Sequence, residues 1–167
     1  NPETADWEIK FMVEHGIDVQ AFCWYNDSAT GPVKEPRNRF QLHDAYQHAK
    51  YEDYMKYCLI WELAATPSNS EKFREHIVPY WFENYFLDEN YAVIDNKLLL
   101  HVYALDSICS DKYFGNFEKA KAEFEYLEEV IEKNNIKNVA FGAHFIKNLR
   151  DSKIKTWLYD EQSFSKN

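Results

Sequence analysis

The sequence predicts an α/β fold built from parallel β-α units, and three observations support this. Apolar segments with strand character begin near residues 18, 54, 97 and 138, about 40 residues apart. A helical pattern falls in every interval, which is typical of strands joined by crossover helices. A chain of 167 residues can form one domain with a single core. Because a closed barrel needs eight strands and about 250 residues, we expect 1–167 to be a single domain that forms part of a TIM (β/α)8 barrel. It would contain about five strands and be cut from a longer protein.

The first third of the chain predicts a helix, a strand and a long loop. Apolar residues recur at helical spacing over 3–15, and Gly16 supplies a C-terminal stop. This stripe is broad enough to face a core and comprises Ala5, Trp7, Ile9, Phe11, Met12 and Val13. A buried-type strand follows over 18–25. The polar loop 26–39 is longer than a simple connection requires, which makes it a candidate binding loop.

The next segments repeat the alternation of helix and strand. We predict a short helix over 41–50 and a second strand over 53–61. A longer helix over 68–86 opens with the Ser-x-x-Glu spacing of a capping box at Ser68. Pro79 lies inside this helix and lacks an amide hydrogen, so it should kink or divide the helix.

The remaining elements continue the pattern. They are a short extended piece over 91–94 with a turn at 95–96, a strand over 97–103, a regular helix from 117 to about 134, a strand over 138–143, a short helix over 144–151 and a strand over 154–159. The helix from 117 is strongly amphipathic. Its acidic residues are expected on the solvated side, and these are Glu123, Glu125, Glu128, Glu129 and Glu132.

Charge and composition exclude several classes of partner. The formal net charge of -9 repels phosphate backbones, so we expect no nucleic acid and favour a neutral ligand. No apolar run approaches the roughly 20 residues that span a bilayer, so we expect no membrane insertion. The sequence has no Gly-rich phosphate loop, no Gly-x-Ser-x-Gly elbow and no Cys-x-x-Cys pair, and we expect no cofactor.

The cysteines and histidines do not predict a metal site. Cys23 and Cys58 lie in predicted strands and are interpreted as small core hydrophobes, while Cys109 is outside them. The histidines share no metal-ligand spacing with cysteines or carboxylates, so we expect no bound metal. His101, within a strand, is interpreted as a core histidine rather than a ligand. Cysteine usage does not decide the cellular compartment.

Aromatic and acidic residues end the first two strands. Trp24 and Tyr25 close the first, and Trp61 and Glu62 close the second. Ligands of parallel α/β folds bind beyond the carboxyl ends of the strands, so these four residues predict a sugar-binding mouth. Aromatic residues make up 17% of the chain, which also allows the alternative that individual rings belong to the core. For Glu62, the alternative is a helix cap or an ion pair.

His43 and Asp44 follow the long loop and are the next candidate residues for binding a sugar hydroxyl. Capping of a helix by Asp44 is the alternative. Glycoside hydrolysis needs two carboxyl groups about 5 to 9.5 Å apart. Asp160 and Glu161 are the candidate partners of Glu62, or else part of a loop. The catalytic residues therefore stay unassigned.

The chain contains a succession of ordered blocks, which are WEIK at 7–10, EHGID at 14–18, FCWY at 22–25, HDAY at 43–46, WE at 61–62, VPYW at 78–81, YF at 85–86 and the segment 91–97. Together these blocks resemble the bacterial glycoside hydrolase family 99-like proteins, which include the WbsX-type proteins of polysaccharide gene clusters. The resemblance extends to about residue 127. It implies a (β/α)8 barrel that acts on α-mannose-containing glycans with retention of configuration.

The resemblance transfers binding positions but no catalytic pair. The family's Glu-x-x-Glu arrangement lies on a late strand, and the spacing of Glu125 with Glu128 falls on the solvated helix and does not match it. We therefore expect the catalytic pair outside this chain. The first hypothesis is a glycoside hydrolase-like domain, a retaining endo-α-mannosidase if it is an enzyme, that binds an oligo- or polysaccharide. The alternatives are a non-catalytic glycan-binding or polysaccharide-biosynthesis protein, and an α/β domain without a sugar role.

Overall fold

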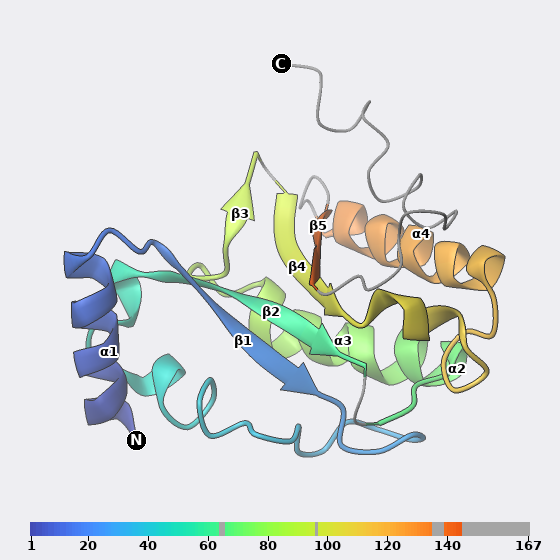
Figure 1. Cartoon of the computed structure of the whole chain (residues 1–167), viewed down its shortest axis with the longest axis horizontal. Coiled ribbons are helices and arrows are strands. Elements are labelled where there is room, and N and C mark those ends of the chain that lie inside the picture. The colour runs from blue at the N-terminus through green and yellow to red at the C-terminus, as the bar shows by residue number, and fades with distance from the viewer. Residues whose placement is uncertain (64–65, 96, 135–138, 145–167) are drawn as a thin grey trace.

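The computed structural model of this chain describes residues 1–63, 66–95, 97–134 and 139–144 (Figure 1). The strands are β1 (Val19–Tyr25), β2 (Lys56–Glu62), β3 (Val93–Ile94), β4 (Lys97–Tyr103) and β5 (Val139–His144). The helices are α1 (Pro2–Glu14) and α4 (Phe117–Lys133), with short 3-10 turns η1 (Tyr46–His48), η2 (Glu52–Tyr54) and η5 (Leu105–Cys109). A continuous helical segment, 70–86, consists of α2 (Ser70–Lys72), η3 (Phe73–Ile77), α3 (Val78–Trp81) and η4 (Phe82–Phe86).

The described strands form one mixed sheet in which the long strands are parallel. β1 pairs with β2, β2 with β4, and β4 with β5, all in parallel. The two-residue β3 pairs antiparallel with the start of β4. The prediction of an α/β fold with parallel β-α units is thus confirmed for the described residues. The antiparallel direction of β3 was not predicted.

One face of the sheet packs against the helical segment 70–86, and we call it the helix-facing side. The strand residues on it are Phe22, Trp24, Tyr57, Leu59, Trp61, Leu98, Leu100 and Val102, and all of them are buried. Ring contacts fix the packing, with 5.3 Å between the centroids of Trp24 and Trp81 and 5.2 Å between those of Trp61 and Phe73. The main core therefore lies between the sheet and this segment.

The opposite side, called the second face, is less covered. It carries Ala21, Cys23, Tyr25, Cys58, Ile60, Glu62, Leu99, His101 and Tyr103. Ala21 and Cys23 are exposed, whereas Cys58 and Glu62 are buried. The prediction that Cys23 is a core residue is therefore wrong, because alternation along β1 turns it away from the helices. Burial raises the pKa of the Cys58 thiol to about 12.

α1 stands beside η1 and η2, near the end of the sheet where β2 begins (Figure 1). The helix and its stop are confirmed, with Gly16 at a φ of 77°. The prediction that a broad apolar stripe of this helix faces the core is wrong. Trp7 is 71% exposed and Phe11 is 62% exposed, and only Ala5 and Ile9 are fully buried, because the helix touches the domain along a narrow line.

The segment 41–50 does not form the predicted helix. It makes turns followed by η1, with backbone bonds such as that from Tyr46 N–H to the carbonyl oxygen of Gln41. Side-chain anchors compete with a regular helix here. The Tyr46 hydroxyl donates to the carbonyl oxygens of Glu52 and Met55, which binds this segment to the start of β2.

The helical segment 70–86 differs from expectation at its start. Asn69, not Ser68, is the N-cap, and its side-chain oxygen accepts a hydrogen bond from the Lys72 amide at 2.8 Å. The Ser68 hydroxyl instead accepts a hydrogen bond from Asn26 at 2.9 Å. Pro79 lies in the first turn of α3, between two π-helical turns, so the irregularity occurs where proline was expected to cause it.

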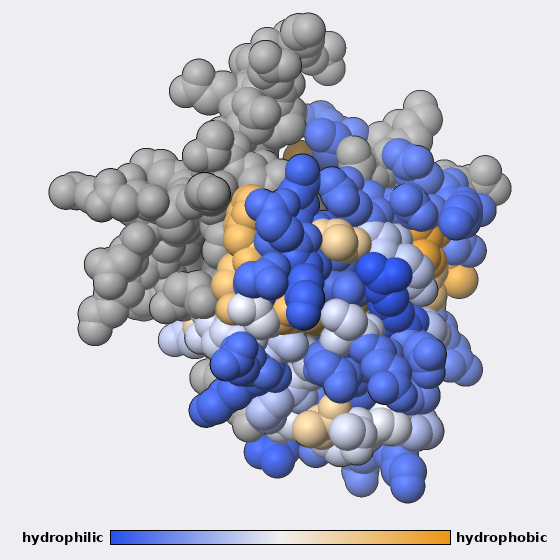
Figure 2. Space-filling model, turned by 90° about the vertical axis from the view of Figure 1, so that its right-hand side faces the viewer, coloured by the Kyte–Doolittle hydropathy of each residue, from blue (hydrophilic) through white to orange (hydrophobic). Residues whose placement is uncertain are grey.

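Two elements of the C-terminal half follow their predicted boundaries closely. β4 and α4 match the predicted segments, and α4 is capped by the Asn116 side chain, which accepts from the Lys119 amide at 2.9 Å. The side of the molecule near α4 is mostly hydrophilic (Figure 2). The prediction that Glu123 is solvated is wrong, since it is 4% exposed and its Oε2 bonds Arg74 Nε at 2.7 Å.

Some predicted elements lie outside the described residues. These are the helix over 144–151 except for His144, which ends β5, the strand over 154–159, and the candidate carboxylates Asp160 and Glu161. Among the described helices, none is long and apolar enough to cross a membrane.

Candidate functional site

The parallel strands end at the same level, so their last residues are paired across the sheet. Tyr25 pairs with Glu62, Glu62 with Tyr103, and Tyr103 with His144. Side chains of residues paired in this way project from the same face of a sheet. Tyr25, Glu62 and Tyr103 therefore lie together on the second face, at the carboxyl ends of the strands, and we call them the carboxyl-end row.

The structure separates the predicted aromatic pair from this row. Trp24 and Trp61 precede Tyr25 and Glu62 by one residue, so they project to the helix-facing side. Trp24 is 3% exposed and its indole N–H donates to the Tyr85 hydroxyl at 3.2 Å. Trp61 is 1% exposed. The hypothesis that these two rings line a sugar-binding mouth is therefore not carried further, because protein side chains already cover them.

The hydroxyl groups of Tyr25 and Tyr113 lie close enough to Glu62 to be affected by its charge. Burial raises the pKa of the Tyr25 hydroxyl, and neighbouring Cys23 and Glu62 raise it further. Burial and the charge of Glu62 raise the pKa of Tyr113 to about 12. At neutral pH both phenols are therefore protonated, and the Tyr25 hydroxyl can donate a hydrogen bond to a ligand. Because Tyr25 is half-buried, its ring and hydroxyl together suit a ligand that is partly apolar and rich in hydroxyl groups.

Two tyrosines of this cluster were missed in the sequence. Tyr103 ends the predicted strand 97–103, and the rule that selected Tyr25 and Glu62 would have selected it as well. Tyr113 comes from the irregular segment after η5, and its hydroxyl donates to the carbonyl oxygen of Thr66 at 3.2 Å. No local sequence pattern indicates that it approaches Glu62.

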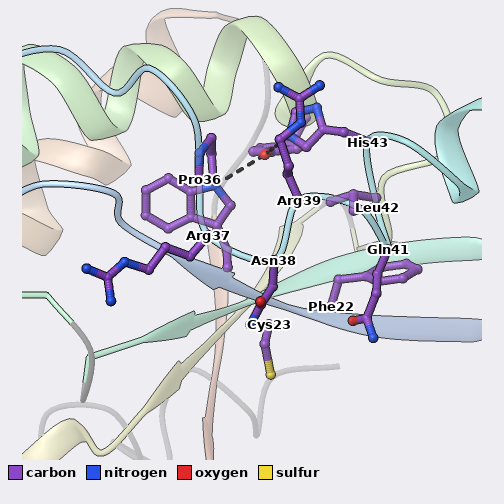
Figure 3. Close-up of a pocket in the computed structure, with 11 residues that line it drawn as sticks. Phe22, Cys23, Pro36, Arg37, Asn38, Arg39, Gln41, Leu42 and His43 are labelled. Carbon is purple, nitrogen blue, oxygen red and sulfur yellow. Dashed lines mark hydrogen bonds between the residues drawn. The ribbon is translucent and has the colours of Figure 1, made fainter.

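His43 and Asp44 lie apart from the row, at the outer edge of β1. His43 is hydrogen-bonded through Nε2 to the Tyr85 hydroxyl, and Asp44 accepts from Arg39 Nη2 at 2.9 Å. His43, Arg39 and the neighbouring loop residues enclose a cavity of about 10 Å³ beside Trp24 (Figure 3), which is space for about one water molecule. Both residues therefore hold the loop, and helix capping by Asp44 does not occur.

His43 should make stability depend on pH. Burial lowers the pKa of His43 below its ordinary value, and the charge of Arg39 lowers it further. The native state thus favours neutral His43, so the cost of protonation is absent above the unfolded pKa of about 6.5 and grows as pH falls through the folded pKa. We expect His43→Gln to lose less stability than wild type between pH 7 and pH 5. Urea unfolding at both pH values measures this, and an equal loss in the two proteins would contradict it.

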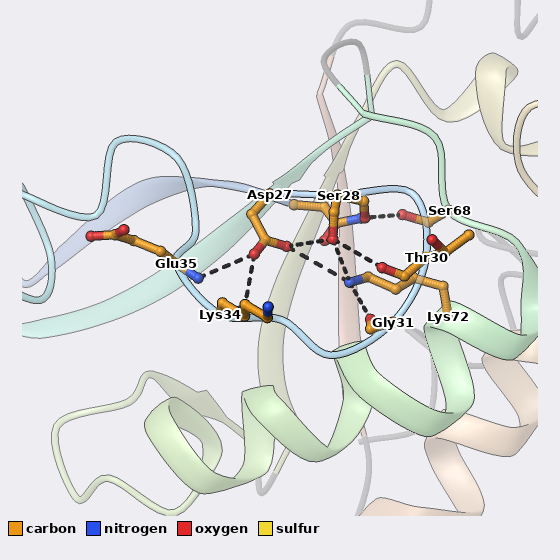
Figure 4. A network of polar contacts seen from close by, with 9 residues as sticks. Asp27, Ser28, Thr30, Gly31, Lys34, Glu35, Ser68 and Lys72 are labelled. Carbon is orange, nitrogen blue, oxygen red and sulfur yellow. Dashed lines mark hydrogen bonds and ion pairs between the residues drawn. The ribbon is translucent and has the colours of Figure 1, made fainter.

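The loop after β1 is held by a buried network (Figure 4). Lys72 is 1% exposed, and its ammonium donates to the carbonyl oxygen of Gly31 at 2.7 Å and lies 3.7 Å from Asp27 Oδ1. Asp27 Oδ2 accepts from the amides of Lys34 and Glu35 at 2.9 and 3.2 Å. The predicted binding loop 26–39 is therefore a fixed structure beside the row.

A larger groove of about 460 Å³ lies between α1 and β1, and the sequence gave no indication of it. Its walls include Ile9 and Met12 of α1 and Phe22 of β1. The groove is at the outer edge of the sheet, away from Glu62 and Tyr103. Within the residues that the structure describes, no group of three or more His, Cys, Asp or Glu side chains could hold a metal ion.

Comparisons with protein-family models, with curated proteins and with solved structures found no match to this chain.

Proposed function

We propose that this chain binds an α-linked, mannose-type glycan at the carboxyl-end row, as a glycoside hydrolase-like domain. The proposal rests on one observation. The last residues of β1, β2 and β4 are paired with one another, so Tyr25, Glu62 and Tyr103 lie side by side on one face of the sheet. A carboxylate forms strong hydrogen bonds with sugar hydroxyls, and tyrosine rings contact the apolar faces of sugars. The resemblance of the ordered blocks to glycoside hydrolase family 99-like proteins supports the choice of mannose.

The strand order supports a barrel as the complete architecture. Parallel neighbours β1, β2, β4 and β5 follow the order of the chain, whereas a doubly wound sheet reverses its order at a switch point. The segment 70–86 follows β2 and α4 follows β4, as in a succession of (β/α) units. We propose that these units belong to a TIM (β/α)8 barrel.

One observation favours a second candidate function, glycan binding without hydrolysis. Among the described residues, the row contains one carboxylate, Glu62, while glycoside hydrolysis needs two at about 5 to 9.5 Å. The proposal therefore assigns sugar binding, not bond cleavage, to these residues. Detection of a reducing end released from α-mannan by the protein would decide for an enzyme.

Glu62→Gln should weaken glycan binding about 10- to 100-fold, which corresponds to the loss of one charged hydrogen bond. The substitution keeps the shape of the side chain, so the fold should persist in circular dichroism. Saturation-transfer NMR and calorimetric titration with α-linked mannotriose measure the effect.

Glu75→Gln is the matched control, because Glu75 is an exposed carboxylate on the segment 70–86. It removes the same charge and should leave binding unchanged. Equal affinities of wild type and Glu62→Gln would show that the row does not bind the sugar. Absence of any carbohydrate contact by the wild-type protein would remove the proposed function.

A further inference from the structure

Arg37 extends the carboxyl-end row by one position. It pairs with Tyr25 as an isolated antiparallel bridge, and its amide donates to the carbonyl oxygen of Tyr25 at 3.1 Å. Residues that lie directly opposite each other in an antiparallel pair share a face. The backbone pairing thus orders Arg37, Tyr25, Glu62 and Tyr103 as neighbours across the end of the sheet.

The Arg37 side chain has no carboxylate partner among the described residues. Arg37 is exposed, and Figure 3 shows its guanidinium group pointing away from that of Arg39. The other described arginines are paired, Arg39 with Asp44 at 2.9 Å and Arg74 with Glu123 at 2.7 Å. The chain has 28 acidic and 19 basic residues, so intramolecular partners are plentiful. A guanidinium left unpaired beside a candidate ligand site is therefore suited to an anion from outside.

The loop holds the backbone of Arg37 in place before any ligand arrives. Pro36 is buried, the amide of Glu35 bonds Asp27, and Asn38 takes a left-handed conformation with a φ of 59°. Lys72 fixes the far side of the loop through Gly31. Only the Arg37 side chain would have to order on binding, which reduces the entropic cost.

We propose that the glycan bound at the row is anionic, and that Arg37 binds its carboxylate or phosphate group. This rests on the proposed function and names the substrate class of the same site. Arg37 and Glu62 are two strand spacings apart, about 10 Å. The anionic group is held at Arg37, away from the Glu62 carboxylate, while hydroxyls of the sugar reach Tyr25 and Glu62. Both kinds of anion offer the paired oxygen atoms that a guanidinium binds in bidentate fashion.

The test compares ligands that differ only in charge. The probes are α-linked mannotriose, the same trisaccharide oxidised to a carboxylate at one C6, its 6-phosphate, and inorganic phosphate alone. Calorimetric titration of the wild-type chain should show one or both anionic sugars binding about 10-fold tighter than the neutral one, with a preference that shrinks as salt rises. The stronger of the two identifies carboxylate or phosphate. Inorganic phosphate should bind far more weakly, because it lacks the sugar contacts.

Arg37→Gln should abolish the preference, so that the variant binds neutral and anionic trisaccharides with equal affinity. Lys34→Gln is the matched control, because Lys34 is an exposed cation of the same loop. It should retain the preference. Equal binding of neutral and anionic sugars by wild type, or an equal loss in the two variants, would overturn the assignment of Arg37 while leaving the proposed function intact. No binding of any sugar would remove both.

Discussion

Replacing Trp61 by alanine is expected to lower the free energy of unfolding by about 3–5 kcal/mol, the usual cost of deleting a large buried aromatic side chain. Trp61 is 1% exposed. Its ring is stacked on Phe73 with centroids 5.2 Å apart and meets Trp81 edge-on at 5.3 Å. The truncation leaves a cavity between β2 and the segment 70–86, which the rigid surroundings cannot fill. Equilibrium urea unfolding followed by circular dichroism measures the change.

Trp7→Ala is the control for this experiment. Trp7 is 71% exposed on α1, so the same change in side chain should alter stability by no more than about 0.5 kcal/mol. The comparison separates the two interpretations of Trp61. A sugar-stacking ring at the surface would lose binding and keep its stability. If Trp61→Ala unfolded at the same urea concentration as the wild-type protein, the core position of Trp61 would be contradicted.

The second large effect is expected at Asp27. Asp27→Ala should cost about 3 kcal/mol, because it leaves the buried Lys72 ammonium without its carboxylate. The amides of Lys34 and Glu35 also lose their acceptor. Loop 26–39 should then exchange its amide hydrogens faster than in wild type. Urea unfolding and hydrogen exchange followed by NMR measure the two consequences.

The cost of Asp27→Ala should depend on pH. Burial by itself opposes ionisation of Asp27, but the amides of Lys34 and Glu35 and the charge of Lys72 outweigh it and hold the Asp27 pKa below its usual value. A depressed carboxyl pKa stabilises the native state above the unfolded value of about 3.9, and this contribution is lost as pH falls through the folded pKa. The stability difference between wild type and variant should therefore be full at pH 7 and shrink below pH 4. A difference that stays constant down to pH 2 would contradict the ionised role of Asp27.

Asp44→Ala provides the matched control for Asp27. Asp44 is also a carboxylate paired with a cation, but its side chain is 50% exposed and that of Arg39 is 41% exposed. Solvent screens this pair, so its removal should cost less than about 1 kcal/mol. Equal losses at the two sites would show that burial of Lys72 has no special energetic weight.

The periodicity of apolar residues correctly predicted those helices and strands whose structure depends mainly on residues close together in the sequence. β4 matches its predicted range, and α4 matches because apolar residues recur regularly between good helix formers. The parallel direction of β1, β2, β4 and β5 matches the prediction from their spacing along the chain. The interval between β1 and β2 nevertheless holds 3-10 turns instead of the predicted helix. Such features depend on periodicity and chain length, which a sequence displays directly.

The failures concern side chains whose surroundings come from distant segments. The run Phe22-Cys23-Trp24-Tyr25 is apolar on both faces, so periodicity could not say which residues meet the helices. The segment 41–50 does not form the predicted helix, and the hydroxyl of Tyr46 within it is hydrogen-bonded to the backbone carbonyl oxygens of Glu52 and Met55. Ser68 does not cap the helix, because its hydroxyl is hydrogen-bonded to Asn26, which lies 42 positions earlier in the chain. Each outcome depends on a partner that is remote in the chain.

For the candidate site, the sequence alone determined that Tyr25 and Glu62 close two strands of a parallel sheet, because a polar loop follows Tyr25 and Glu62 is the first charged residue after the run 57–61. Only the tertiary structure decided that Trp24 and Trp61 turn toward the helices, that Tyr103 joins the row, and that Arg37 returns to pair with Tyr25. The physical reason is that side-chain direction alternates at every residue of a strand. The helical segment 70–86 decides which face of the sheet becomes the core, because it packs on that face. Its packing depends on contacts between residues that are far apart in the sequence.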